Sequence, residues 1–253
     1  MTAFKDHFSG HAQAYRDARP TYPTALYAWL AQESPDRQLA WDVGCGNGQA
    51  SVALAAHFAR VIGTDPSANQ IAGAQPQANV EYRVEPAERS SLADASASVV
   101  TVAQALHWFD FAPFYAEVRR VLRPGGMLAA WSYAACKVAD PGVDRIIARL
   151  YDDLTGPFWP PERAYVDAGY RTLPFPFTPV AAPAFPMLVR WRVEQLLRYL
   201  RSWSATQRFI TALGEDPVAI VEDDLREAWG DADRQRDVSW IFHLRAGRVD
   251  STA

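Results

Sequence analysis

A run of closely spaced glycines lies between an acidic residue and an alanine-rich segment early in the chain. The run reads Asp42-Val-Gly-Cys-Gly-Asn-Gly and ends at Gly48. Glycine has no Cβ and tolerates positive φ, so its backbone can turn sharply and lie against a ligand. A second acid, Asp65, ends the next apolar run and suits the hydroxyls of a ribose. These residues predict a site for a cofactor that carries a nucleoside.

The spacing of the glycines bears on which cofactor this is. A dinucleotide loop has the pattern G-x-G-x-x-G, whose last glycine lets the helix pack on the strand. In this chain Gln49 stands where that last glycine would fall, directly after Gly48. Asp42 would repel a diphosphate, whereas it would attract an ammonium or a sulfonium group. S-adenosylmethionine carries both cations and is therefore the cofactor that these residues favour.

Strands and helices must alternate along the chain if they are to hold such a loop. Apolar runs predict strands at 39–43, 61–64, 80–84, 98–103 and 127–133, and helical patterns lie at 22–34, 49–59, 68–74 and around Phe114, Val118 and Val121. This alternation is typical of βαβ units. The run at 98–103 is almost wholly apolar, as expected for a parallel strand buried on both faces. We therefore expect an α/β fold with a doubly wound, mostly parallel sheet.

The alternation stops after Tyr133. The later part of the chain predicts helices at 140–154, 194–213 and 217–229, a segment rich in proline and aromatic residues at 156–186, and a last strand at 238–244. We expect residues 137–230 to form an inserted cap of helices and aromatic residues near the carboxyl ends of the strands. Aromatic residues beside proline in such non-periodic segments suit the wall of a pocket. The whole chain, 1–253, is expected to form one domain.

Composition narrows the possible partners. The formal net charge of −4 argues against nucleic acid, because neutralising phosphates requires a basic surface. There is no apolar stretch of membrane-spanning length and no signal-peptide pattern at the N-terminus. The two cysteines, Cys45 and Cys136, are too few for a disulfide-stapled secreted scaffold. We expect a cytoplasmic protein whose partner is a small molecule, and the oligomeric state stays open.

Taken together, the motifs resemble those of the class I S-adenosylmethionine-dependent methyltransferases. The glycine run looks like their first motif, and residues 65–67 (Asp-Pro-Ser) look like their acidic motif after the second strand. Residues 86–88, 104–108 and 121–126 match the segments after strands three and four and before strand five. The resemblance implies a Rossmann-like sheet of seven strands. The segment from Tyr15 to Pro23 and the His107-Trp108 pair are similar to the trans-aconitate methyltransferase branch, which methylates small acids.

This resemblance implies a role for each matching residue. The glycine loop would contact the methionine moiety, Asp65 would accept both ribose hydroxyls, and Ala87 and Glu88 would flank the adenine. Residues 1–35 would cover the cofactor. The expected cofactor-binding residues are Tyr15, Arg19, Asp42, Gly44, Cys45, Gly46, Gly48, Asp65, Pro66, Ser67, Ala87, Glu88, Gln104 and Ala105; the expected catalytic residues are His107 and Trp108, at the methyl-donor face; no metal ligands are expected.

Several of these residues also have a purely structural interpretation. The alternatives are a tight turn without a ligand for the glycine run, a helix cap at Asp65, a solvated loop acid at Glu88, core packing or a capping contact at His107, and a salt-bridged surface helix at Tyr15 and Arg19. Cys45 fits a crowded turn as a small side chain better than it fits a nucleophile.

The chemistry of methyl transfer bears on the acceptor. A carboxylate has an ordinary pKa of about 4 and is already ionised, so it needs no general base. A hydroxyl or a carbon acid would need one, for which His107 is the candidate. No second base is evident, which favours a small carboxylic acid, with Arg16, Arg163, Arg190 and Arg192 as candidate partners. The alternatives are a quinol or secondary metabolite as the acceptor of a C- or O-methyltransferase and, more distantly, an NAD-dependent oxidoreductase or a non-catalytic binding module.

Overall fold

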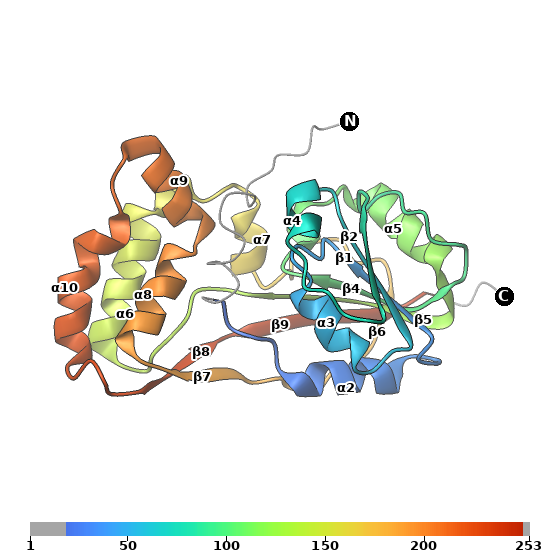
Figure 1. Cartoon of the computed structure of the whole chain (residues 1–253), viewed down its shortest axis with the longest axis horizontal. Helices are drawn as coiled ribbons and strands as arrows, with labels where there is room; N and C mark the ends of the chain where they lie inside the picture. The colour runs from blue at the N-terminus through green and yellow to red at the C-terminus, as the bar shows by residue number, and fades with distance from the viewer. Residues whose placement is uncertain (1–18, 250–253) are drawn as a thin grey trace.

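Seven strands form the central sheet of the computed structural model, which describes residues 19–249 of the chain (Figure 1). In chain order they are β1 (Leu39–Val43), β2 (Arg60–Asp65), β3 (Val80–Val84), β4 (Ala97–Ala103), β5 (Leu122–Tyr133), β6 (Thr178–Pro179) and β9 (Phe242–Arg248). Their order across the sheet is β3-β2-β1-β4-β5-β9-β6. The first five are mutually parallel, whereas β9 runs antiparallel to both β5 and β6. The predicted doubly wound, mostly parallel, seven-stranded sheet is confirmed.

Helices cover both faces of this sheet. α2 (Thr24–Glu33) and α3 (Gln49–Ala55) pack on one face, and α5 (Phe111–Val121) packs on the other. The short helices α4 (Ala68–Ala72) and η1 (Leu106–Trp108) follow the carboxyl ends of β2 and β4. Two of the expected cofactor motifs, residues 65–67 and 104–108, lie at these two strand ends.

The alternation of side chains along β5 shows why its sequence is apolar throughout. Met127, Ala129 and Trp131 belong to the apolar cluster on the α2 face. Leu128 and Ala130 belong to the cluster on the α5 face. Because successive side chains of a strand point to opposite faces, a strand covered on both sides needs apolar residues at every position.

A group of helices stands beyond the carboxyl ends of the parallel strands, on the left in Figure 1. We call this group the helical lobe (residues 137–162 and 187–240). It consists of α6 (Pro141–Ala148), the π-helical turn η2 (Arg149–Leu154), η3 (Gly156–Phe158), α8 (Val193–Arg201), α9 (Ser204–Leu213), α10 (Pro217–Trp229), β7 (Met187–Trp191) and β8 (Arg236–Trp240). The strands β7 and β8 pair as a separate two-stranded antiparallel sheet.

The residues between the two parts of the lobe return to the central sheet. α7 (Arg163–Asp167) and the chain after it place Val166, Tyr170 and Phe177 in the apolar cluster on the α5 face. β6 then pairs with β9 at the edge of the sheet. The expected cap over 137–230 is therefore not continuous in space, because this apolar stretch covers the sheet instead.

Two later elements differ from their expected form. The helix expected over 194–213 is two helices, because Trp203 has extended backbone (φ −65°, ψ 137°) and is buried. The strand expected over 238–244 is also divided, into β8 and β9, on either side of Ile241, whose exposed fraction is 64%. β8 pairs with β7, a strand that was not predicted, and β9 enters the central sheet.

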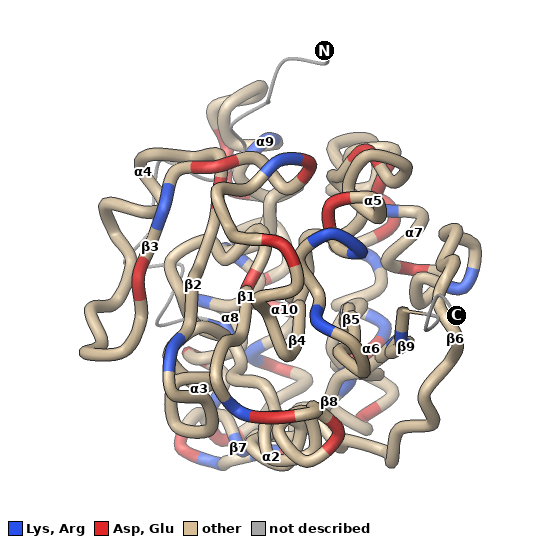
Figure 2. The backbone as a smooth tube through the Cα atoms, turned by 90° about the vertical axis from the view of Figure 1, so that its right-hand side faces the viewer, with Lys and Arg blue, Asp and Glu red and all other residues tan. Residues whose placement is uncertain are grey.

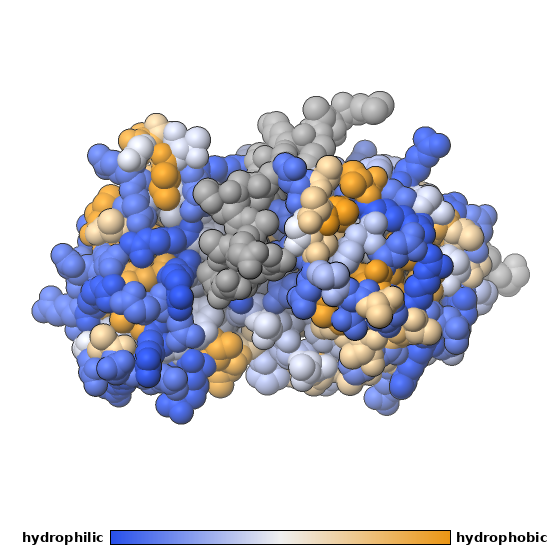
Figure 3. All heavy atoms as spheres, viewed as in Figure 1, coloured by the Kyte–Doolittle hydropathy of each residue, from blue (hydrophilic) through white to orange (hydrophobic). Residues whose placement is uncertain are grey.

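Acidic and basic residues are interspersed along the loops and helices at the end of the molecule that Figure 2 shows. On the face shown in Figure 3, the helical lobe is mostly hydrophilic and its apolar residues form separate small patches. None of the described helices is long and apolar enough to cross a membrane.

Candidate active site

The glycine run forms the loop between β1 and α3. Gly44, Gly46 and Gly48 all have positive φ, of 65°, 54° and 86°. A Cβ on Gly48 would lie 2.1 Å from the hydroxyl oxygen of Tyr82, and one on Gly44 would lie 2.7 Å from the Cβ of Ala105. The loop thus needs glycine for its conformation at all three positions and for close packing at the first and last.

Asp65 holds this loop against the turn that follows β2. One of its carboxylate oxygens accepts from the backbone N–H of Gly46 at 2.9 Å, and the other accepts from the N–H of Ser67 at 2.9 Å. The N-cap of α4 is Ser67, whose hydroxyl accepts from the N–H of Gln70 at 3.3 Å. The capping role considered for Asp65 therefore belongs to Ser67, with Pro66 in the turn between them.

Asp42 is fully buried at the end of β1. Its carboxylate accepts from the hydroxyl of Ser51 on α3 at 2.6 Å and from that of Thr101 on β4 at 3.0 Å. Burial raises the pKa of Asp42 to about 6, even though both hydroxyls oppose the shift. A negative charge at this position is costly, and a cation beside the glycine loop would stabilise it.

Cys45 has the environment of a packing residue. Its N–H donates to the carbonyl of Thr64 at 3.0 Å, which holds the loop on β2. Burial, together with the charges of Asp42 and Asp65, raises the pKa of its thiol well above the ordinary value. Because only the thiolate is a strong nucleophile, this cysteine is poorly suited to covalent catalysis.

Gln104 follows β4 with strained backbone, since its φ of +56° is unusual for a residue other than glycine. Its side-chain amide donates to the carbonyl of Tyr133 at 3.0 Å. Its side-chain oxygen Oε1 is buried and has no hydrogen-bond partner among the described residues. The next residue, Ala105, is the one that contacts Gly44. A buried acceptor with no partner, on the residue next to the one that contacts the glycine loop, fits the ammonium group of S-adenosylmethionine.

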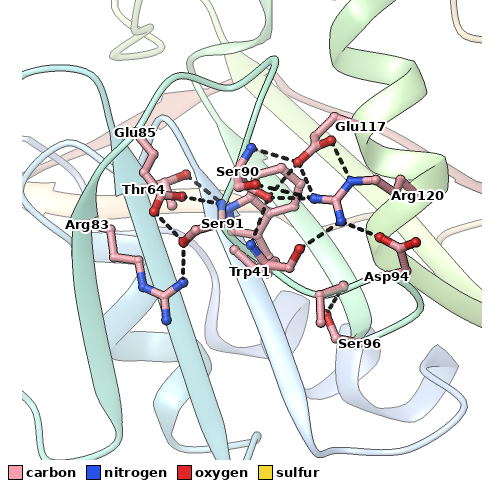
Figure 4. Close-up of polar contacts among 12 residues, drawn as sticks. Trp41, Thr64, Arg83, Glu85, Ser90, Ser91, Asp94, Ser96, Glu117 and Arg120 are labelled. Carbon is pink, nitrogen blue, oxygen red and sulfur yellow. Dashed lines mark hydrogen bonds and ion pairs between the residues drawn. The ribbon is translucent and has the colours of Figure 1, made fainter.

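The loop after β3, which carries Ala87 and Glu88, is pinned by two residues of α5 (Figure 4). Buried Glu117 accepts from the N–H and the hydroxyl of Ser90 at 2.7 and 2.6 Å. Arg120 donates to Glu117 at 2.6 Å and to the carbonyl of Leu92 at 2.8 Å. The side chain of Arg120 is only 33% exposed, and through these contacts it joins α5 to the loop.

Within this loop Ala87 is buried and packs in the cluster on the α5 face. Glu88 accepts from the backbone N–H of Asp110, immediately before α5, at 3.0 Å. Glu88 thus has a definite structural contact, which links the loop after β3 to the start of α5.

His107 and Trp108 lie in η1 with their rings 4.8 Å apart. The ring nitrogen Nδ1 of His107 is 2.8 Å from the hydroxyl of Tyr170. Burial, together with the positive charge of Arg163, lowers the pKa of His107 to about 3. The imidazole is therefore neutral at physiological pH and accepts a proton only weakly.

A pocket lies between η1 and the helical lobe. It is lined by Arg19, Gln104, His107, Trp108, Tyr133, Ala134, Trp159, Pro160, Arg163, Val166, Tyr199, Trp203 and Ser204. Arg19 donates to the hydroxyl of Tyr133 at 3.1 Å and to the carbonyl of Ser202 at 3.4 Å, so it joins β5 to the end of α8. Tyr15 lies outside the described residues.

Only some of the arginines proposed as substrate partners line this pocket. Arg163 lines it, whereas Arg190 and Arg192 pair at 3.6 Å with Asp237 and Asp233 on the surface of the lobe. Arg16 lies outside the described residues. Trp159 could be found from the sequence, because it stands beside proline in a non-periodic segment. Tyr133, Tyr170 and Trp203 could not, because their sequence positions are typical of core residues. The described residues include no group of three or more His, Cys, Asp or Glu side chains placed to hold a metal ion.

Comparison with known proteins identifies the family. Residues 41–130 match a sequence profile described as a methyltransferase domain. A Dictyostelium discoideum protein named as a methyltransferase is 34% identical over 235 residues, covering 92% of this chain and 89% of the relative. A Saccharomyces cerevisiae protein named as an S-adenosylmethionine-dependent methyltransferase is 30% identical over 135 residues, 50% of this chain and 46% of the relative.

Among solved structures, one described as a type II methyltransferase from Anaeromyxobacter dehalogenans is 47% identical. It superposes with a TM-score of 0.84 over 91% of this chain and 97% of its own. Similarity of this extent covers both the central sheet and the helical lobe. The chain belongs to the class I S-adenosylmethionine-dependent methyltransferases.

Proposed function

We propose that this enzyme methylates an oxygen of a small carboxylic acid. The observation that carries the proposal is a pocket with positive charge and no strong base. Arg19 and Arg163 line it, and no aspartate or glutamate is among its described lining residues. His107, with its pKa lowered to about 3, would be a poor base for a hydroxyl group. A carboxylate acceptor needs no base, because it is ionised at neutral pH.

The pocket residues would hold the acceptor next to the methyl group of the cofactor. S-adenosylmethionine supplies, when bound, an electrophilic methyl group on a sulfonium. The chain aligns the acceptor with that group and excludes water, which is how proximity lowers the barrier of a displacement. Trp108, Trp159 and Trp203 provide apolar walls for this purpose.

For the cofactor, the proposal places its methionine moiety at the glycine loop. The support is the negative charge of Asp42 and the unpartnered oxygen of Gln104, which suit an ammonium group. Asp65 would bind the ribose hydroxyls, and Ala87 and Glu88 would flank the adenine. The hydrogen bond that Glu117 accepts from Ser90, and the one that Arg120 donates to Leu92, would then keep the loop after β3 in place.

A quinol or another aromatic metabolite is the second candidate acceptor. It is favoured by the five aromatic residues of the pocket, namely Trp108, Tyr133, Trp159, Tyr199 and Trp203. A phenol has an ordinary pKa of about 10 and must lose its proton before or during transfer. The pocket meets this requirement poorly, because His107 is a weak base.

A labelling panel separates the two candidates. Cofactor with a radiolabelled methyl group is incubated with trans-aconitate, fumarate, benzoate, hydroquinone and catechol. We expect label in one or more acids, and release of that label as methanol under mild alkali, which cleaves methyl esters but neither ethers nor C-methyl groups. Label confined to the phenols, or label that alkali does not release, would refute the carboxylate proposal.

A further inference from the structure

Arg163 lines the pocket and is held by contacts of its Nε and of the face of its guanidinium. Its Nε donates to the hydroxyl of Tyr151 at 2.7 Å and to the carboxylate of Asp167 at 3.1 Å. Its guanidinium lies over the ring of Trp159, 4.6 Å from the ring centre. The two terminal nitrogens, Nη1 and Nη2, have no hydrogen-bond partner among the residues that the structure describes. They form the fork that binds a carboxylate with two hydrogen bonds.

The residues that hold Arg163 come from different elements and are themselves fixed. Tyr151 lies in the π-helical turn η2, and its carbonyl accepts from the indole N–H of Trp159 at 3.2 Å. The hydroxyl of Tyr151 also lies 2.7 Å from the carboxylate of Asp167. π-helical turns occur frequently at functional sites. This arrangement reduces the rotamer freedom that an arginine would otherwise lose on binding an anion.

His107 is held in a comparable way by Tyr170. Tyr170 is fully buried and has a strained φ of +59°, directly after Gly169 with a φ of +61°. Burial raises the pKa of the Tyr170 hydroxyl, so it keeps its proton, and it lies 2.8 Å from Nδ1 of the imidazole, where we assign it as the donor. A neutral imidazole that accepts at Nδ1 carries its proton on Nε2. Among the described residues, Nε2 has no partner, and His107 lines the pocket.

We infer that Arg163 and His107 together form an anion subsite that binds a carboxylate of the methyl acceptor. The terminal nitrogens of Arg163 and the Nε2–H of His107 are the donors, and Tyr151, Asp167 and Tyr170 are positioning residues. This inference rests on the proposed function, since it names the groups that select a carboxylate over a neutral acceptor. It also gives His107 the role of a hydrogen-bond donor in place of a base.

The role of the Arg163 charge is tested with Arg163→Gln, which removes the charge and keeps an N–H donor. Binding of benzoate and of benzamide is measured by calorimetry on the full chain saturated with S-adenosylhomocysteine. In Arg163→Gln we expect benzoate affinity to fall at least ten-fold and benzamide affinity to change less than three-fold. Arg163→Lys should recover part of the loss, because lysine keeps the charge but lacks the fork. Arg190→Gln, a surface arginine outside the pocket, is the matched control and should match the wild type.

The tautomer of His107 is tested by nitrogen NMR on the histidine-labelled full chain, with its signal identified by loss in His107→Gln. We expect a neutral ring protonated at Nε2 from pH 5 to 8, and benzoate should shift its signal when the homocysteine product is bound. Tyr170→Phe should alter the tautomer signal and raise the KM of the acceptor, with S-adenosylhomocysteine affinity unchanged. A ring protonated at Nδ1, or one that becomes charged in this range, would contradict the assignment.

The outcomes also separate this inference from the proposed function. If acids are esterified but Arg163→Gln still prefers benzoate over benzamide, or if no carboxylate shifts the His107 signal, the subsite is wrong and the function stands. If only phenols are methylated, the function is wrong, and the subsite fails with it.

Discussion

The backbone N–H of Gly46 donates to the carboxylate of Asp65 at 2.9 Å. The glycine loop after β1 and the acid after β2 are therefore joined directly, before any cofactor is considered. Because the same carboxylate also binds the N–H of Ser67, one side chain sets the position of two turns. A substitution at Asp65 consequently has a binding effect and a structural effect, and an experiment has to separate them.

Asp65→Ala should weaken binding of S-adenosylhomocysteine by about 1.5–3 kcal/mol, the range for hydrogen bonds that involve a charged group. Calorimetry measures this directly. Ser67→Ala measures the structural part, because it removes the N-cap of α4 and leaves the carboxylate in place. It should lower the free energy of unfolding by about 1 kcal/mol and weaken binding by less than Asp65→Ala does. Equal affinities for Asp65→Ala and the wild type would restrict Asp65 to a structural role.

Two glycines of the loop should differ in their tolerance of alanine. At Gly46 a Cβ meets only the side-chain oxygen of Gln70, at 3.7 Å, so Gly46→Ala should cost about 1–2 kcal/mol for its positive φ. At Gly48 the Cβ also collides with Tyr82, which should add about 1–3 kcal/mol. Urea unfolding of the two variants measures the difference. Similar stabilities would show that Tyr82 moves aside freely.

Asp42 should give stability a pH dependence that Asp42→Asn lacks. Its pKa is raised from 3.8 to about 6 in the folded protein, so the folded state binds its proton more tightly than the unfolded state. The contribution of Asp42 to the free energy of unfolding is therefore largest below about pH 4. It falls by about 3 kcal/mol as the pH rises through 6. The measurement is the unfolding free energy of both proteins at pH 4.5 and 7. A constant difference between them would refute the shift.

Glu117 should show the opposite dependence. Burial alone would raise its pKa, but the hydrogen bonds from Arg120 and Ser90 outweigh burial and lower the pKa to about 2. Its contribution is present above about pH 4.5 and is lost as the pH falls toward 2. Glu117→Gln should thus be less stable than the wild type by about 2–3 kcal/mol at pH 7. The gap should be much smaller at pH 2.5 than at pH 7 and should close only below about pH 2, so an equal gap at pH 7 and pH 2.5 would contradict this account.

The first half of the fold was predictable because its signals are local. The strands at 39–43 and 80–84 have the predicted bounds, as each is an apolar or alternating run that ends at turn residues. The helix at 217–229 is also as predicted, since Asp216 accepts from the N–H of Val218 and Pro217 occupies the first turn. The cofactor motifs follow from the same logic, because parallel strands end at one edge of the sheet.

The second half depends on contacts between distant residues. Nothing in the local sequence shows that the backbone leaves the helical path at Trp203, whose ring packs against Tyr151, Trp159 and Tyr199. In the same way, Tyr170 reaches His107 across 63 residues of chain. Such contacts are decided by packing, and the acceptor side of the site could not be derived from spacing.

The apolar cluster on the α2 face continues without interruption into the helical lobe. Leu26 of α2, Trp131 of β5 and Trp229 of α10 all belong to it. The helices around the acceptor pocket thus share their apolar core with one side of the sheet that carries the cofactor motifs. We expect calorimetric melting to give one endotherm, with equal calorimetric and van't Hoff enthalpies. A loss of packing in the lobe would then lower the melting temperature of the cofactor half as well.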